Sequence, residues 1–162
     1  MHNFINFTLP DYFVSTPKNY EEKIGLFFEN FNFFYFFEKK ILKLEIFNEN
    51  FLYSKRKILI GSYFQKKPFS QSQILNVIKS KKLDMILDFR VACSSISKWM
   101  SYLLSNEAIY IIYVLVGSVY CCFPLEEKYL VSYKIDNKSS RVNKIGIIFN
   151  DGGLNINWSN VN

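Results

Sequence analysis

The alternating segment Leu83–Val91 carries the one group of charged side chains in this sequence whose spacing suggests chemistry. Asp84, Asp88 and Arg90 fall on the same face of that segment. Two carboxylates on one face could perform acid–base catalysis or bind a cation. Four residues of extended strand, however, separate them by about 13 Å, which is too far to share a metal. Arg90 gives Asp88 a charge partner two residues away, so we interpret this face as solvated.

The cysteines and the single histidine form no recognisable catalytic or metal-binding pattern. Cys93, Cys121 and Cys122 are odd in number and include an adjacent pair, which is typical of buried reduced thiols in a cytoplasmic protein. Cys93 precedes a predicted helix but has no identifiable base beside it. His2 is the only histidine, and no zinc spacing, phosphate-binding glycine loop or nucleophile-elbow motif is present. The sequence therefore predicts no metal, no cofactor and no enzyme.

Lysines and aromatic residues gather in the first half of the chain. Residues 1–82 contain 13 Lys+Arg and 7 Asp+Glu, whereas residues 83–162 contain seven of each, so the first half holds the whole net charge of +6. Cations and aromatic rings together suit single-stranded nucleic acid, although the chain has only three arginines for reading base edges. The same surface would suit a protein partner. The predicted partner-binding residues are Lys39, Lys40, Lys43, Tyr53, Lys55, Arg56, Lys57 and Tyr63.

Residues 108–125 form an uncharged segment of eighteen residues that the rest of the molecule must cover. Its length is at the lower limit for a membrane-spanning helix, which needs about 20 residues. Its many β-branched and aromatic residues favour a sheet instead. Gly117-Ser118 suits a two-residue turn, so we predict two paired strands at about 108–116 and 119–123. The first should be a central strand covered on both faces.

Periodicity and turn signals supply the remaining elements. Apolar residues at helical spacing predict helices over 18–31, 71–80 and 94–105, the second beginning at the capping-box pair Ser70 and Gln73. Alternation predicts a Lys-rich hairpin over 41–60 with its turn at 48–50, followed by a bulge at Gly61. It also predicts C-terminal strands at 129–135, 145–149 and 154–158, with a turn at 150–153 between the last two.

These elements predict an α+β fold. A single domain over residues 1–162 would consist mainly of antiparallel β-sheet, with a C-terminal meander, packed by two or three α-helices. Met1–Pro10 has neither a basic start nor a long apolar run, so we expect no secretory signal and a cytoplasmic location.

In size, in its lack of motifs and in the C-terminal run KYLVSYKI…KIGIIF-NDGG-LNINW, the chain resembles the small cytosolic immunity proteins of bacterial toxin systems, including contact-dependent inhibition. The resemblance implies a non-enzymatic inhibitor that occludes a cognate protein toxin in a 1:1 heterodimer. Immunity proteins against nucleases are often acidic, whereas this chain is basic. Two alternatives stay open: a nucleic-acid-binding protein that uses the Lys/Tyr-rich hairpin, and a membrane-associated protein that uses residues 108–125.

Overall fold

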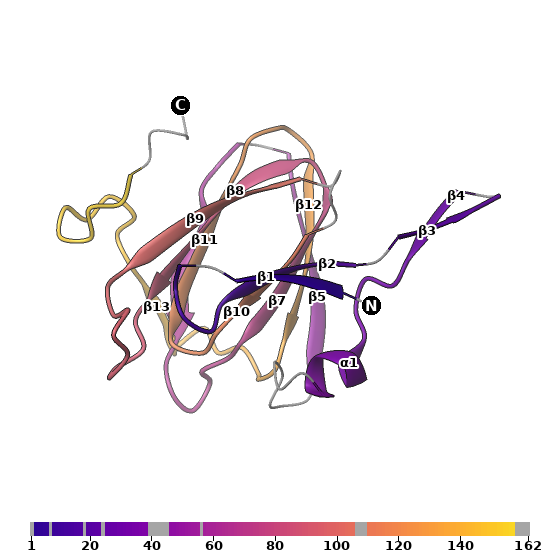
Figure 1. Cartoon of the computed structure of the whole chain (residues 1–162). Coiled ribbons are helices and arrows are strands. Elements are labelled where there is room, and N and C mark those ends of the chain that lie inside the picture. The colour runs from indigo at the N-terminus through magenta and orange to yellow at the C-terminus, as the bar shows by residue number, and fades with distance from the viewer. Residues whose placement is uncertain are drawn as a thin grey trace.

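Two antiparallel sheets make up almost all of the regular structure. A computed structural model describes residues 2–6, 8–17, 19–23, 25–38, 46–55, 57–105 and 110–157. The first sheet has the order β1 (His2–Asn6), β2 (Phe13–Pro17), β10 (Ile111–Val114), β7 (Gln73–Lys79), β12 (Tyr129–Ile135), β5 (Asn48–Ser54). The second has the order β13 (Lys144–Gly146), β6 (Ile60–Gln65), β11 (Ser118–Pro124), β8 (Lys81–Asp88), β9 (Trp99–Ser105). A separate hairpin, β3 (Asn19–Glu22) and β4 (Gly25–Phe28), extends away from both sheets (Figure 1).

The two sheets pack face to face, and from β5 onward most consecutive strands cross between them. β7 lies in the first sheet and β8 in the second, and β10, β11 and β12 alternate in the same way. This alternation is that of a jelly-roll sandwich. Side chains of both inner faces form one core cluster, which includes Val14, Leu75, Ile86, Ile112 and Tyr129.

The α+β prediction is wrong, because the described residues contain one helix, α1 (Phe33–Glu38), of only six residues. The segments predicted to be helices form strands: β3 and β4 within 18–31, β7 within 71–80, and β9 within 94–105. For β7 the reason is burial on both faces. In β7, Leu75 and Val77 point into the core while Ile74 packs on the opposite side of the sheet, so apolar residues occupy neighbouring positions and imitate helical spacing.

The uncharged segment forms strands, as predicted, but they do not pair with each other. Ile112 of β10 lies opposite Val14 and Leu75 in the first sheet, whereas Tyr120 of β11 lies opposite Ile86 in the second. The prediction of a hairpin is therefore wrong. The turn at Gly117, where φ is +84°, carries the chain from one sheet to the other.

The first strand of this segment is central and covered on both faces, which confirms that prediction. Ile112 and Val114 pack into the core between the sheets, whereas Ile111 and Tyr113 pack in a second cluster with Phe36 of α1. No helix among the described residues has the length and apolar character needed to cross a membrane.

The strands predicted at 83–91 and 129–135 correspond to β8 and β12. The solvated face assigned to the first is wrong, because Asp84 and Asp88 are only 1% and 0% exposed. The charge partner predicted for Asp88 is confirmed: Arg90 donates to it at 2.8 Å. Burial tends to raise the pKa of Asp88, but hydrogen bonds from Arg90 and Ser95 hold it below its ordinary value.

The predicted hairpin over 41–60 and the predicted C-terminal returning strand both differ from the structure. Residues 48–50, predicted as a turn, belong to β5, which pairs with β12; residues 41–45 lie outside the described part of the chain. A turn does follow Ile148, since Asp151 donates to its carbonyl, but residues 154–157 do not form the predicted returning strand.

Gly61 occupies the predicted bulge, where the pairing of β6 with β11 shifts register. Its φ is +105°, and a Cβ here would lie 2.6 Å from the carbonyl oxygen of Tyr120. We expect Gly61→Ala to lower the free energy of unfolding by about 2–4 kcal/mol, because it combines a disfavoured φ with a backbone clash. Urea unfolding measures this. Gly146→Ala is the control, since nothing lies within 4 Å of its Cβ position; equal losses for the two variants would contradict the prediction.

Candidate functional site

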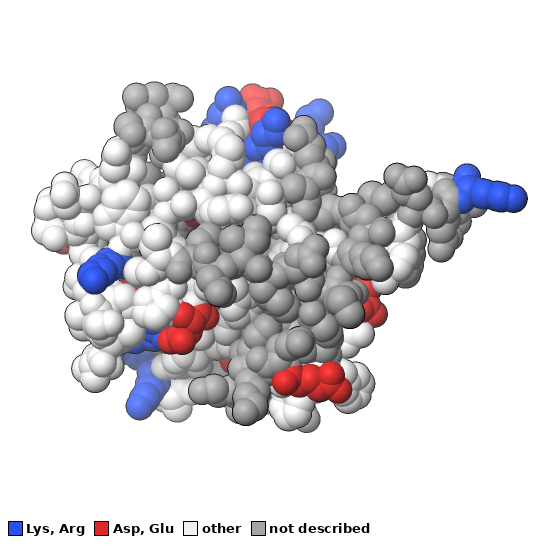
Figure 2. Space-filling model, viewed as in Figure 1, with Lys and Arg blue, Asp and Glu red and all other residues white. Residues whose placement is uncertain are grey.

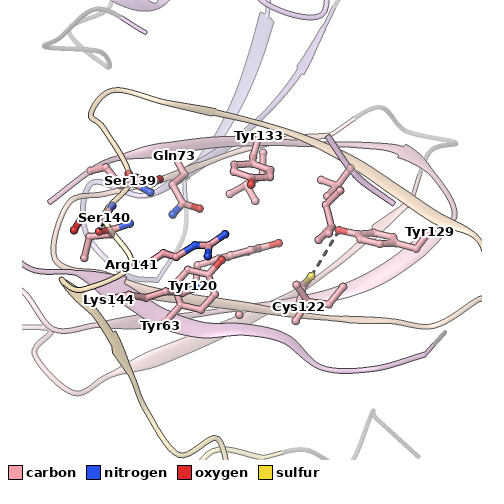
Figure 3. A pocket seen from close by; sticks show the side chains of 17 residues that line it. Tyr63, Gln73, Tyr120, Cys122, Tyr129, Tyr133, Ser139, Ser140, Arg141 and Lys144 are labelled. Atoms are coloured by element: carbon pink, nitrogen blue, oxygen red, sulfur yellow. Dashed lines mark hydrogen bonds between the residues drawn. The ribbon is translucent and has the colours of Figure 1, made fainter. Parts of the chain in front are cut away.

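A cavity of about 290 Å³ lies between the two sheets. Strands β5, β7 and β12 of one sheet and β6 and β11 of the other contribute to it, together with the loop before β13 (Figure 3). Its polar and sulfur-containing lining residues are Tyr63, Gln65, Gln71, Gln73, Tyr120, Cys122, Tyr129, Tyr133, Ser139, Ser140, Arg141 and Lys144.

Four tyrosines line this cavity from opposite walls. Tyr63 and Tyr120 come from the second sheet, whereas Tyr129 and Tyr133 come from β12 of the first. Burial raises the pKa of all four hydroxyl groups. At neutral pH they are therefore neutral phenols, able to donate a hydrogen bond and to offer a flat ring to a ligand.

Two cations lie at the solvent side of the cavity. Lys144 places Nζ 3.2 Å from the centroid of the Tyr63 ring, and Arg141 points into the cavity (Figure 3). Desolvation lowers the pKa of Lys144. Neither cation forms an ion pair with any carboxylate among the described residues. Such a pair of cations can bind an anionic group by charge-assisted hydrogen bonds.

The loop that carries Arg141 and leads to Lys144, the first residue of β13, is anchored to the neighbouring strand β6. The backbone N–H of Ser140 donates to Oε1 of the buried Gln65 at 3.1 Å. Asn143 donates from Nδ2 to Ser140 Oγ at 2.9 Å, and its carbonyl accepts from the backbone N–H of Lys66 at 2.9 Å. These bonds hold the loop against the strand that bears Tyr63.

A buried ion pair lies behind one wall of the cavity. Lys82 and Asp84 of β8 are 0% and 1% exposed, and Lys82 Nζ lies 2.9 Å from Asp84 Oδ1. Tyr120 bridges them: its hydroxyl accepts from Lys82 at 2.7 Å and donates to Asp84 at 2.8 Å. Desolvation raises the pKa of Asp84, against the opposing effect of Lys82.

The cavity offers no carboxylate and no imidazole among the described residues that line it. The described residues also contain no group of three side chains able to hold a metal ion. Proton transfer in this cavity would therefore depend on tyrosine, lysine or cysteine side chains, or on groups that act through them.

Of the eight predicted partner-binding residues, the structure places Tyr63 in the cavity. Tyr53, Lys55 and Lys57 are exposed and do not line it. The other four, Lys39, Lys40, Lys43 and Arg56, lie outside the described residues. On the face in view, Lys and Arg form several separate groups, some next to acidic residues (Figure 2).

The cavity was not predicted from the sequence, although one signal was visible. Tyr129, Val131 and Tyr133 alternate along one strand, so they share a face, and all three line the cavity. Nothing in the sequence shows that this face lies opposite Tyr63 and Tyr120, because that follows from how the sheets pack.

Comparison with known proteins identifies consistent relatives. The model of the dTDP-4-dehydrorhamnose 3,5-epimerase family matches residues 6–162. The dTDP-4-dehydrorhamnose 3,5-epimerase of Shigella flexneri is 27% identical over 156 residues, which cover 96% of this chain and 86% of that protein.

Solved structures of proteins with this name agree with the same fold. The protein from Elizabethkingia anophelis is 26% identical with a TM-score of 0.91, and the match covers 98% of this chain and 86% of that one. The protein from Bacillus anthracis, solved with TDP and PPi bound, is 25% identical with a TM-score of 0.91, covering 98% and 91%.

These relatives overturn the functional predictions made from the sequence. All are named as enzymes, so the predictions of a toxin immunity protein, a non-enzymatic inhibitor and a toxin heterodimer are wrong. The nucleic-acid-binding and membrane-associated alternatives are wrong for the same reason. Small size, strand content and a lack of motifs are shared by many unrelated β proteins, so they could not identify this family.

We expect Lys82→Met to destabilise the protein by about 3–5 kcal/mol, because it leaves the buried Asp84 charge without its partner. The double variant Lys82→Met/Asp84→Leu should recover a large part of that loss, since no buried charge is left behind. Urea unfolding of wild type and both variants tests this. If the double variant is as unstable as the single one, the pair is not the source of the effect.

Proposed function

This chain belongs to the dTDP-4-dehydrorhamnose 3,5-epimerase family, and on that basis we propose that it epimerises a dTDP-linked 4-keto-6-deoxyhexose. The observation that carries the proposal is the family match over residues 6–162, combined with a cavity between the sheets that is lined by tyrosines and bordered by two cations. The sugar would occupy the cavity and the diphosphate would lie at its solvent side.

The chemistry follows from the ketone of such a sugar. A carbonyl at C4 acidifies the hydrogens on C3 and C5, since the electron pair left behind is delocalised onto the carbonyl oxygen as an enolate. Returning a proton to the opposite face of the carbon inverts its configuration, with no net oxidation or reduction. Inversion therefore needs proton-transferring groups on two sides of the sugar ring.

The cavity supplies such groups on two sides. Tyr63 and Tyr120 stand on one sheet and Tyr129 and Tyr133 on the other, so a ring held between them meets phenol groups from both walls. Neutral phenols can also donate a hydrogen bond to a developing enolate oxygen, which is worth more in a cavity shielded from water.

The cations suit the other half of the ligand. A nucleoside diphosphate carries its negative charge between the base and the sugar, and Arg141 and Lys144 have no described carboxylate to compete for them. The related protein from Bacillus anthracis was solved with TDP and PPi bound. Tyr63, in contact with Lys144, adds an aromatic face beside this site.

A cytoplasmic location fits this proposal, because the three cysteines are free thiols. That the full length of the chain, residues 1–162, acts as one domain stays a prediction from its length.

Exchange with solvent tests the reaction itself. Incubation of the purified protein with dTDP-4-dehydrorhamnose in D₂O should introduce deuterium at C3, at C5 or at both, detected by mass spectrometry and proton NMR. A sample without protein provides the background rate. Binding of the sugar nucleotide with no deuterium uptake above background would overturn the proposed reaction.

Substitution of the two cations tests the diphosphate site. We expect Arg141→Gln and Lys144→Gln each to weaken TDP binding about 10-fold in calorimetry, because each removes one charge-assisted contact from a partly solvated site. Thymidine, which has no phosphate, should bind wild type and variants alike. Lys57→Gln removes an exposed cation outside the cavity and is the matched control. An unchanged TDP affinity in both cavity variants would contradict this assignment.

A further inference from the structure

We infer that Tyr120 is the residue that removes the proton from the sugar carbon, with Lys82 and Asp84 as its positioning residues; this rests on the proposed function. The three side chains form a closed hydrogen-bonded triangle. Lys82 Nζ donates to the Tyr120 hydroxyl at 2.7 Å, the hydroxyl donates to Asp84 Oδ1 at 2.8 Å, and Lys82 Nζ lies 2.9 Å from the same oxygen.

The position of the triangle connects the cavity to a buried pair of charges. Tyr120 lines the cavity, whereas Lys82 and Asp84 do not, and both are almost completely inaccessible to solvent. Tyr120 is labelled in the middle of the cavity lining in Figure 3. Any exchange of a proton between the cavity and the carboxylate would therefore pass through the phenol group.

Stability alone does not account for this arrangement. Burial of an ion pair usually costs as much as the pair returns, and apolar residues of the same volume are often at least as stabilising. Here the pair lies within the main core, beside apolar residues such as Ile86 and Leu104. A phenol that bridges a carboxylate and an ammonium can, in contrast, accept a proton from a ligand and pass its own proton to the carboxylate, so that no charge builds up on the phenol.

The proton transfer balances with the groups present. The C–H bond adjacent to the ketone breaks as its proton bonds to Tyr120 Oη. The Oη–H bond breaks in the same step, and that proton bonds to Asp84 Oδ1. The C–H electron pair becomes part of the enolate, whose negative charge rests on the C4 oxygen. Asp84 changes from carboxylate to neutral acid, and Lys82 stays an ammonium throughout.

Other features of the triangle suit this role. A phenol oxygen has one donor and two acceptor positions, and within the triangle Tyr120 uses one of each, which leaves its second acceptor position without a bond to Lys82 or Asp84. The ammonium of Lys82 also lies 5.3 Å from the centroid of the Tyr120 ring and 5.9 Å from that of Tyr129. Burial raises the pKa of Asp84, which increases the affinity of this carboxylate, the final acceptor in the relay, for the proton.

The test compares deuterium uptake from D₂O into dTDP-4-dehydrorhamnose by wild type and Tyr120→Phe. We expect the rate constant to fall at least about 100-fold, the usual scale for loss of a general base, with TDP affinity changed less than twofold. Tyr53→Phe is the matched control, since this exposed tyrosine lies outside the cavity. Urea unfolding verifies that each variant is folded.

The positioning roles of Lys82 and Asp84 are tested separately, by the dependence of deuterium uptake on pH. The relay needs Asp84 as a carboxylate, so the rate of deuterium uptake by wild type should fall as the pH is lowered and Asp84 becomes protonated. The other described titratable groups around the triangle are Cys121, Cys122 and Tyr129, which burial keeps protonated in that range. The Cys122 thiol and the Tyr129 hydroxyl lie 3.6 Å apart. Asp84→Glu and Lys82→Arg should retain activity that Asp84→Asn and Lys82→Met lose.

The outcomes are distinguishable. Uptake by Tyr120→Phe within threefold of wild type, with wild type active, would overturn the inference and leave the proposed function intact. If the rate of deuterium uptake by Asp84→Asn falls at low pH in the same way as that of wild type, the relay through Asp84 is overturned. No uptake by wild type would overturn the proposed function, and the inference with it.

Discussion

From β5 onward, most consecutive strands of this chain cross between two facing sheets, and the rest of the structure depends on that constraint. The crossing places β7 and β8, or β10 and β11, on opposite walls although they are neighbours in sequence. Side chains that point inward from successive strands therefore meet across the interior. The core and the cavity are two parts of the same interior, filled with apolar side chains in one region and left open among tyrosines in the other.

The same crossing explains how polar chemistry reaches the middle of a β-sandwich. Lys82 and Asp84 point inward from β8, and the phenol of Tyr120 on the adjacent β11 forms a hydrogen bond with each of them. A buried charge is tolerated only when it is paired and hydrogen-bonded. Because the bridging group also borders the cavity, the ion pair is hydrogen-bonded to a cavity-lining side chain although it does not line the cavity itself.

Membership of the family and the side chains that line the cavity bear on different aspects of function. The family supplies the class of substrate and reaction, whereas the cavity supplies phenols, a thiol and two cations, with neither carboxylate nor imidazole among its described lining residues. A reaction at carbon next to a ketone needs only proton transfer and stabilisation of an enolate. Phenols backed by a buried carboxylate and an ammonium can provide both.

The sequence by itself determined the strands whose pattern is local. The alternation of β8 and β12, the bulge at Gly61, the positive-φ turn at Gly117 and the ion pair of Asp88 with Arg90 could all be predicted, because each depends on residues close in sequence. Only the tertiary structure decided which strands pair, that β7 and β9 are strands, and that Tyr63 and Tyr133 face the same cavity. A strand buried on both faces, such as β7, loses the alternation that identifies it, and in β9 the exposed Leu103 next to the buried Leu104 obscures it. Contacts between sheets leave no periodic signal in the chain.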